Sequence, residues 1–290
     1  MSFYPRGLQT MMSSFITRSL RSQSLKELVK SNVHKRYAAT AFNIGALFNV
    51  NNRLRVEEDQ YSGYYSSPIQ QPYRNVLELL GKRTQKDFAN AHMLMGELQS
   101  KFMCQLIKFF KPKNILEIGS FTGCSAIAMG SCLPPNAKLT TLELDAQCVK
   151  VAREYIEMAQ LQDKVFVKEG PALNSIDDLI KESPSLKYDF IFLDADKGNY
   201  KNYYELIMKH GLLSDHGVLI ADNTLFYGLV HRHAGFEKEI DPQVGIPKSK
   251  KEEAAKIHDF NEFVSNDPRV EVLMLPLFDG LSIIYKSKSL

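Results

Sequence analysis

The sequence has no tryptophan, and it has no run of 18 consecutive apolar residues. A membrane-spanning helix needs about 20 such residues, so no transmembrane segment is predicted. Cysteine is also scarce: the four cysteines are Cys104, Cys124, Cys132 and Cys148, and no two form a Cys-x-x-Cys pair. We therefore expect no disulfide framework and interpret the cysteines as reduced thiols of an intracellular protein.

Acidic residues are nearly absent from the first 56 positions, where Glu27 is accompanied by six arginines and three lysines. Because the whole chain has a net charge of +3, the remaining residues carry a net charge of −5. Nucleic-acid binding relies on clustered lysines and arginines, and the acidic remainder has no basic stripe. The sequence therefore argues against a nucleic acid as the main partner.

The basic segment at the beginning of the chain is rich in serine and arginine. Its apolar residues recur at helical spacing: Leu8, Met11, Met12, Phe15, Ile16 and Leu20. This combination is typical of a mitochondrial transit peptide, and a disordered basic tail is the alternative. We predict a basic extension over residues 1–56, a linker over 57–73 that is broken by glycine and proline, and a folded domain over 74–290.

Short apolar runs alternate with helical patterns in the predicted domain. The expected strands lie at 114–119, 138–144, 165–170, 189–195, 217–223, 270–276 and 281–287. The expected helices between them lie at 125–132, 146–159, 172–181 and 200–210. Repeated strand-helix units predict an α/β fold with a mostly parallel sheet, and the short turn before the last strand predicts an antiparallel hairpin.

Ligands of open α/β sheets bind at the carboxyl ends of the strands, so the residues there are of special interest. The first strand ends in a turn that contains Gly119 and Gly123, and the second strand ends in Glu143. Glycines allow a ligand to approach the backbone, and an acid at the second strand can accept hydrogen bonds from ribose hydroxyls. Together they predict an adenosine-type ligand, although glycine turns after strands are common.

Carboxylates are concentrated after the fourth and fifth strands. Asp194, Asp196 and Lys197 follow one strand, and Asp222 and Asn223 end the next. Neighbouring strand ends would bring Asp194, Asp222 and Asn223 together. Burying several carboxylates without a counter-charge is costly, and their hard oxygen atoms suit Mg²⁺, Ca²⁺ or Mn²⁺. A divalent cation explains this pattern, whereas a helix cap and an Asx-turn are the structural alternative.

Six ordered motifs carry a family resemblance. They are EIGSFTGCSAIAM, TLELD, EGPAL, DFIFLDADKGNY, ADNTLFYG and DPRVEVLMLPLFDGL. In this order and spacing, the chain resembles the cation-dependent O-methyltransferases related to caffeoyl-CoA O-methyltransferase and, more distantly, catechol O-methyltransferase. The resemblance extends from about Val76 to the C-terminus. It implies a Rossmann-like methyltransferase fold with a seven-stranded sheet whose last strand is antiparallel.

The resemblance also implies S-adenosylmethionine as the methyl donor, a divalent cation, most simply Mg²⁺, and a small phenolic or catechol acceptor. The implied donor-binding residues are Glu117, Gly119, Ser120, Ser125, Glu143, Ala172, Asp194 and Asp196. The implied metal ligands are Asp194, Asp222 and Asn223. Lys197 would be the general base that removes a proton from the acceptor hydroxyl. Family members are commonly dimers, so a homodimer is expected.

Some residues depart from the family pattern. Phe226 and Tyr227 stand where the family often has tryptophan, and its usual Gln-Gly-Gln stretch is here Gln99-Ser100-Lys101. A non-catalytic scaffold protein with this fold is one functional alternative. A nicotinamide oxidoreductase is another, disfavoured because the third glycine of its motif is missing and hydride transfer needs no cluster of aspartates.

Overall fold

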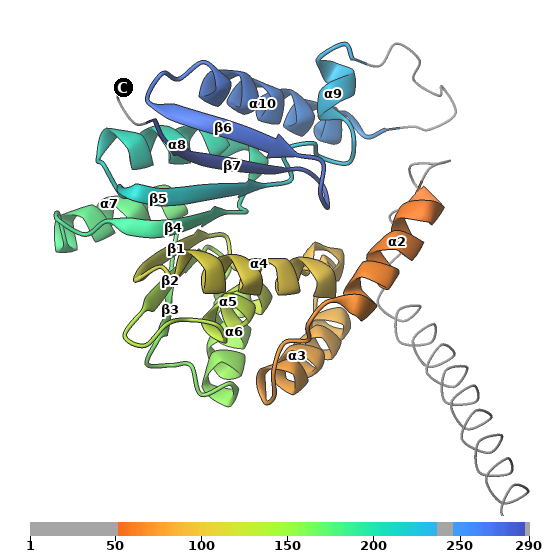
Figure 1. Ribbon diagram of the computed structural model, residues 1–290, viewed down its shortest axis with the longest axis vertical. Helices are drawn as coiled ribbons and strands as arrows, with labels where there is room; N and C mark the ends of the chain where they lie inside the picture. The colour runs from red at the N-terminus through yellow and green to blue at the C-terminus, as the bar shows by residue number, and fades with distance from the viewer. Residues whose placement is uncertain (1–51, 237–245, 288–290) are drawn as a thin grey trace, which may run out of the picture. The chain divides into compact units, whose positions relative to one another are not determined.

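The computed structural model describes residues 52–236 and 246–287, which are coloured in Figure 1. The chain divides into two units, Met1–Arg53 and Leu54–Leu290, and the second contains the fold. Most of the predicted basic extension, with its proposed transit segment, lies outside the described residues. In the described part of the chain, no helix is long and apolar enough to cross a membrane.

One seven-stranded sheet forms the centre of the second unit, with the strand order β3-β2-β1-β4-β5-β7-β6. The strands are β1 (Asn114–Ile118), β2 (Lys138–Glu143), β3 (Val165–Glu169), β4 (Tyr188–Leu193), β5 (Leu213–Asp222), β6 (Val270–Leu275) and β7 (Leu281–Lys286). Strands β1 to β5 pair in parallel, and β7 is antiparallel to both β5 and β6. The predicted α/β class and the terminal hairpin are confirmed.

Helices cover both faces of the sheet. The helices of the described chain are α2 (Asn52–Tyr65), α3 (Tyr73–Asp87), α4 (Glu97–Phe110), α5 (Cys124–Gly130), α6 (Ala146–Met158), α7 (Ala172–Glu182), α8 (Tyr200–Lys209), α9 (Val230–His233) and α10 (Lys248–Ser265), with 3₁₀ turns η2 (Ala91–Met93) and η3 (Lys197–Asn199). Helices α3 to α6 pack together beside the β1–β3 part of the sheet, and α7, α8 and α10 form the second group (Figure 1). The four helices expected between strands all form.

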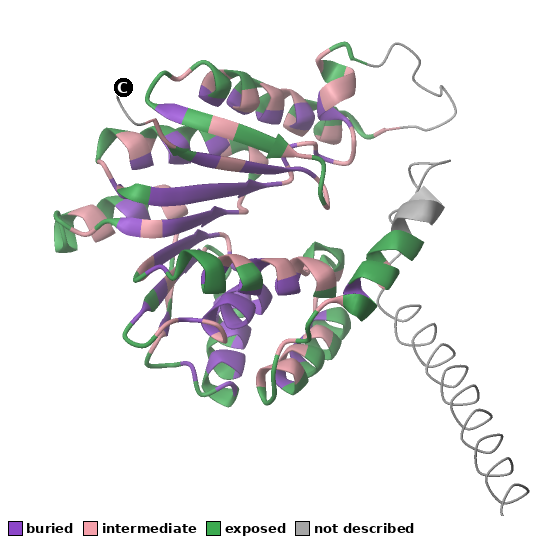
Figure 2. Cartoon of the chain, viewed as in Figure 1, coloured by how far each residue is buried: buried purple, intermediate pink, exposed green. Residues whose placement is uncertain are grey.

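The core lies between the sheet and its helices, and the central strands are mostly purple in Figure 2. Ile191 in β4 and Leu219 in β5 are completely buried, as expected for parallel strands that are covered on both faces. Local capping reinforces the pattern: the side chain of Asp145 accepts hydrogen bonds from the backbone nitrogens of Gln147 and Cys148 at the start of α6. The carboxyl ends of the parallel strands β1 to β5 thus lie at one edge of the sheet.

The first part of the predicted linker over 57–73 is helical in the structure, because α2 occupies Asn52–Tyr65. A tertiary contact accompanies this helix: Lys101 Nζ on α4 donates a 2.6 Å hydrogen bond to the backbone oxygen of Gly63. Tertiary context of this kind overrides the low helix propensity of glycine. The remaining residues up to α3 contain no helix or strand, as expected.

Candidate functional site

The predicted site residues gather at the carboxyl edge of the sheet. Strand β1 lies between β2 and β4. The chain runs from β1 to β2 and β3 on one side of β1, and then crosses to β4 on the other side. Such a reversal of strand order opens a crevice for a ligand at the carboxyl ends. The turn that follows β1 therefore lies at the position where an open α/β sheet binds its ligand.

The turn after β1 depends on glycine. Gly119 has a φ of +93°, and a Cβ atom at this position would approach the backbone oxygen of Asp194 to 2.1 Å. Its neighbours are held by Glu143, whose Oε2 accepts hydrogen bonds from the backbone nitrogens of Ser120 at 3.2 Å and Phe121 at 2.7 Å. Glu143 thus connects the end of β2 to the glycine turn, a function that its position in the sequence did not reveal.

Glu117 is a completely buried carboxylate beneath this turn. Thr141 Oγ1 donates a hydrogen bond of 2.5 Å to Glu117 Oε2, and the Ser125 hydroxyl bonds to the same carboxyl group. The other oxygen, Oε1, has no hydrogen-bond partner. Burial raises the pKa of Glu117 to about 7. A buried acceptor without a partner is energetically unfavourable, so Glu117 fits a ligand that brings a donor, such as an amino group.

Ala172 and Asp196, two further residues of the implied methyl-donor site, follow strands at the same edge of the sheet. Ala172 is the first residue of α7, and the preceding Gly170 donates a backbone hydrogen bond of 2.9 Å to the backbone oxygen of Glu143. Asp196 is exposed, and its carboxylate accepts hydrogen bonds from Tyr203 at 2.6 Å and from Asn199 at 2.5 Å. Asp196 therefore holds the η3 turn against α8.

Two carboxylates meet where β4 and β5 end. Leu193 pairs with Ala221 across these strands, so the next residues, Asp194 and Asp222, are neighbours. Asp222 is buried, with 4% of its surface exposed. Its burial and the adjacent Asp194 carboxylate raise the pKa of Asp222 to about 7. The adjacency that the strand pattern predicted is thus present, and so is the electrostatic repulsion that a cation would relieve.

Asn223 completes this set with an oriented amide. Its backbone has a φ of +56°, and its backbone nitrogen donates a 2.7 Å hydrogen bond to Asp222 Oδ1. The side-chain nitrogen donates to Asp279 Oδ2 at 3.2 Å, which leaves the amide oxygen to accept or to act as a ligand. Two carboxylates and an amide oxygen are hard donors that fit Mg²⁺ or Ca²⁺. In the described ranges, this site included, no three or more His, Cys, Asp or Glu side chains form a group that could hold a metal ion.

Lys197 points back to the aspartates from η3. Its Nζ lies 2.9 Å from Asp194 Oδ1 and 2.7 Å from the hydroxyl oxygen of Tyr200. Burial opposes the charge on this ammonium group, but Asp194 and Tyr200 together outweigh burial and raise the pKa of Lys197 above its ordinary value. Lys197 is therefore protonated in this arrangement and serves as the counter-charge of Asp194.

Sequence reasoning missed two polar residues of the site. Gln99, on α4, donates from Nε2 to Asp222 Oδ2 at 2.5 Å. Tyr200 is completely buried; its hydroxyl donates to the backbone oxygen of Asp222 at 3.1 Å and accepts a hydrogen bond from Lys197 Nζ. The departure from the family pattern around Gln99 was a signal, but contact with Asp222 depends on how α4 packs. Nothing in the sequence indicated that Tyr200 belongs to the site, apart from its position three residues after Lys197.

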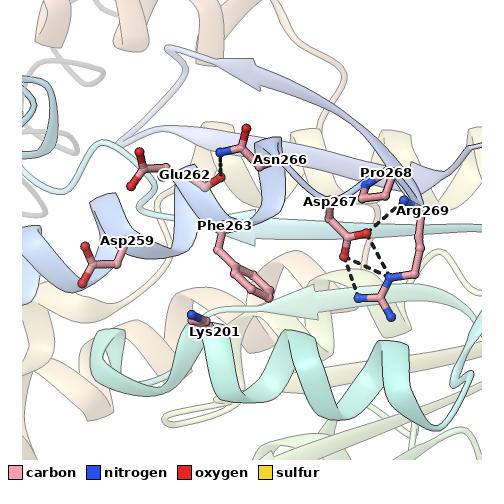
Figure 3. A pocket seen from close by; sticks show the side chains of 8 residues that line it. All are labelled: Lys201, Asp259, Glu262, Phe263, Asn266, Asp267, Pro268 and Arg269. Carbon is pink, nitrogen blue, oxygen red and sulfur yellow. Dashed lines mark hydrogen bonds and ion pairs between the residues drawn. The ribbon is translucent and has the colours of Figure 1, made fainter.

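A separate cavity lies between α8 and the end of α10 (Figure 3). Its lining residues are Lys201, Asp259, Glu262, Phe263, Asn266, Asp267, Pro268 and Arg269. Asp267 and Arg269 bond to each other in this cavity, and Lys201 Nζ lies 4.1 Å from the centre of the Phe263 ring. None of the strand-end residues lines it, so this cavity is distinct from the candidate site.

Comparison with known proteins agrees with this geometry. A family model described as O-methyltransferase matches residues 67–287. The chain is 29% identical over 220 residues to a caffeoyl-CoA O-methyltransferase of Populus kitakamiensis, covering 76% of this chain and 89% of that protein. It is 33% identical over 186 residues to caffeoyl-CoA O-methyltransferase 2 of Petunia hybrida, covering 64% of this chain and 73% of that protein.

Solved structures show the same similarity. The SAH-bound methyltransferase PaMTH1 of Podospora anserina superposes with a TM-score of 0.72 at 28% identity, covering 83% of this chain and 98% of that one. The O-methyltransferase of Bacillus cereus in complex with SAH superposes with a TM-score of 0.64 at 28% identity, covering 80% and 97%. Fold and site thus define a methyltransferase-like α/β protein.

The chain belongs to the O-methyltransferase family that includes the caffeoyl-CoA O-methyltransferases. The predicted resemblance is confirmed, and the nicotinamide oxidoreductase alternative is set aside. The family assignment covers the folded domain and leaves the first 66 residues outside the match.

Proposed function

We propose that this enzyme transfers the methyl group of S-adenosylmethionine to one hydroxyl of a catechol-like or caffeoyl-type vicinal diol, with a divalent cation at the strand ends. The observation that supports it best is the adjacency of Asp194 and Asp222 beside Lys197. Two solved relatives contain SAH, the form that the donor takes after losing its methyl group. A single crevice therefore accounts for donor, cation and acceptor.

Residues of the turn after β1 and of its neighbours would bind the donor. Glu117 would accept a hydrogen bond from the donor's amino group at its unpartnered Oε1. Ser125 and Thr141 hold the carboxyl group of Glu117 in place. Gly119 and Ser120 would surround the methionine end, and Glu143 would accept hydrogen bonds from the ribose hydroxyls. Ala172 and Asp196 would close the adenine side.

Asp194, Asp222 and Asn223 would hold the cation, because they present hard oxygen atoms at adjacent strand ends. A divalent cation held by these residues would lower the pKa of an acceptor hydroxyl. Gln99 and Asp279 would keep the ligands Asp222 and Asn223 in one orientation through the hydrogen bonds described above.

Lys197 would take the proton of the acceptor hydroxyl at its Nζ atom. This role requires a neutral amine, whereas the Asp194 carboxylate now raises the pKa of Lys197. Neutralising the Asp194 charge removes this stabilisation of the ammonium form, and burial then favours the neutral amine. The Tyr200 hydroxyl, 2.7 Å from Nζ, would keep the amine directed at the acceptor. The deprotonated oxygen then attacks the methyl group in line, which the site promotes by alignment.

The test is methyl transfer from labelled S-adenosylmethionine to a simple catechol, with Mg²⁺ or with a chelator. We expect activity that requires Mg²⁺ and falls at least about a hundredfold in Asp222→Ala. Asp215→Ala is the matched control, because Asp215 belongs to the same strand but is exposed and pairs with Lys286. This variant is expected to retain wild-type activity.

Separate binding measurements identify which part of the proposal fails. Full activity with chelator would contradict the cation assignment. Donor binding with no transfer to several catechols would contradict the acceptor class alone. Absence of donor binding would overturn the assignment of the donor site, on which the other steps depend.

A further inference from the structure

Two cysteines meet at the contact between α4 and the end of α5. Cys104 belongs to α4, and Cys132 follows the last residue of α5 after Ser131. The hydroxyl oxygen of Ser131 lies 3.9 Å from Cys104 Sγ and 3.4 Å from Cys132 Sγ. Both thiol groups thus contact the same hydroxyl group. All four cysteines are free thiols, so both sulfur atoms are available for chemistry.

The two thiols differ in access. Cys104 is buried, with 2% of its surface exposed, and its sulfur donates to the backbone oxygen of Ala128 at 3.1 Å. Cys132 is partly exposed. A reagent that arrives from solvent therefore meets Cys132 before it meets Cys104.

The more exposed thiol, Cys132, is also the more acidic of the two. The neighbouring Cys104 thiol lowers the pKa of Cys132 to about 6, although burial acts in the opposite direction. The Cys132 thiol and burial together raise the pKa of Cys104 above its ordinary value. The thiolate is the nucleophilic form of cysteine. At neutral pH, Cys132 thus has the character of an attacking thiolate and Cys104 that of a protonated partner.

We propose that Cys104 and Cys132 form an oxidation site at which a hydroperoxide converts the two thiols into a disulfide between α4 and the segment after α5. The Cys132 thiolate attacks one peroxide oxygen, the O–O bond breaks, and hydroxide leaves and takes up a proton as water. Cys132 is then a sulfenic acid. The sulfur of Cys104 loses its proton and attacks the Cys132 sulfur, the S–S bond forms, and the S–O bond breaks to release a second water.

This site shares two helices with the proposed methyl-transfer residues but does not depend on them. Helix α4 also carries Gln99, which holds Asp222, and α5 begins directly after the glycine turn. The bond would therefore join α4 to the segment at the opposite end of α5 from that turn. The reaction uses only thiols and a peroxide. Its test therefore measures free thiols and is independent of the methyl acceptor and the cation.

The experiment treats the full chain with a small excess of hydrogen peroxide and then counts free thiols under denaturing conditions. We expect two of the four thiols to disappear and to return after treatment with dithiothreitol. Proteolysis without reductant is expected to yield a peptide pair joined through Cys104 and Cys132. Circular dichroism before and after oxidation checks that the protein stays folded.

Two variants distinguish this pair from general oxidation. Cys132→Ser is expected to keep all three of its thiols at the same peroxide dose. Cys148→Ser is the matched control, because Cys148 is buried in α6 and burial raises its pKa to about 12. This variant is expected to lose two thiols, as the wild type does. Four surviving thiols in the wild type, a Cys132 sulfinic acid without a bridge, or a bridge to Cys124 or Cys148 would each overturn the proposal.

Discussion

Gln99 Nε2 lies 2.5 Å from Asp222 Oδ2, although 123 residues separate the two in the sequence. Helix α4 thus supplies the hydrogen bond that holds the carboxylate at the end of β5. Asp222 Oδ1 accepts from the backbone nitrogen of Asn223, so both oxygen atoms of this buried carboxylate are oriented. A carboxylate that is fixed in this way is ready to act as a ligand without rearrangement.

Replacing Gln99 with leucine is expected to weaken Mg²⁺ binding about tenfold, because it removes the group that orients Asp222. Calorimetric titration of the protein with Mg²⁺ measures this effect without relying on turnover. Gln105→Leu is the control, since Gln105 is an exposed residue of the same helix. Equal Mg²⁺ affinities in the two variants would show that Gln99 does not support the cation site.

Replacing Glu143 with alanine is expected to weaken S-adenosylmethionine binding by about tenfold to a hundredfold. The change removes an acceptor for the ribose hydroxyls and releases the backbone nitrogens of Ser120 and Phe121, and hydrogen bonds to a charged group contribute about 1.5–3 kcal/mol each. Equilibrium dialysis with labelled donor measures the loss. The control is Glu169→Ala, because Glu169 pairs with Glu143 in the neighbouring strand but is exposed. Unchanged donor affinity in Glu143→Ala would refute this role.

Replacing Gly119 with alanine is expected to lower the free energy of unfolding by about 2 kcal/mol or more. A side chain at a φ of +93° is strained, and its Cβ would collide with the backbone of Asp194. Urea denaturation followed by circular dichroism measures the change. Gly96→Ala is the matched control, because a Cβ there meets no atom within 4 Å. The explanation fails if both variants unfold at the same urea concentration.

Replacing Asp267 with asparagine is expected to produce a pH-dependent loss of stability. Arg269 donates to Asp267 Oδ2 at 2.6 Å and holds the pKa of this carboxyl at about 2, despite its partial burial. The unfolded-state pKa is about 3.9, so the folded state favours the ionised form. The stabilisation is complete above about pH 4 and disappears as the pH falls through about 2.

The corresponding measurement compares Asp267→Asn with the wild type in urea at several pH values. We expect a difference of about 2 kcal/mol in the free energy of unfolding at pH 7, which shrinks towards pH 2. Asp259→Asn is the control, because Asp259 lines the same cavity but is exposed. A difference that stays constant with pH would show that the ion pair is not its cause.

The sequence by itself determined the strands, the helices between them and the edge at which the site lies. Ile191 and Leu219 belong to apolar runs that can only be buried strands, and such runs alternating with helices leave few topologies open. Because parallel strands end at one edge, Asp194 and Asp222 were predicted to be neighbours, and the strand pairing confirms it. The motif order was specific enough to indicate the family.

Only the tertiary structure decided which side chains from distant elements complete the site. Gln99 and Tyr200 are ordinary helical residues in the sequence, and their contacts with the end of β5 depend on how α4 and α8 pack against the sheet. The helix within the predicted linker contacts Lys101 of another element. Local sequence patterns predict which residues are buried and in which direction the chain runs. Polar contacts between distant elements depend on how those elements pack, which no single segment of the sequence determines.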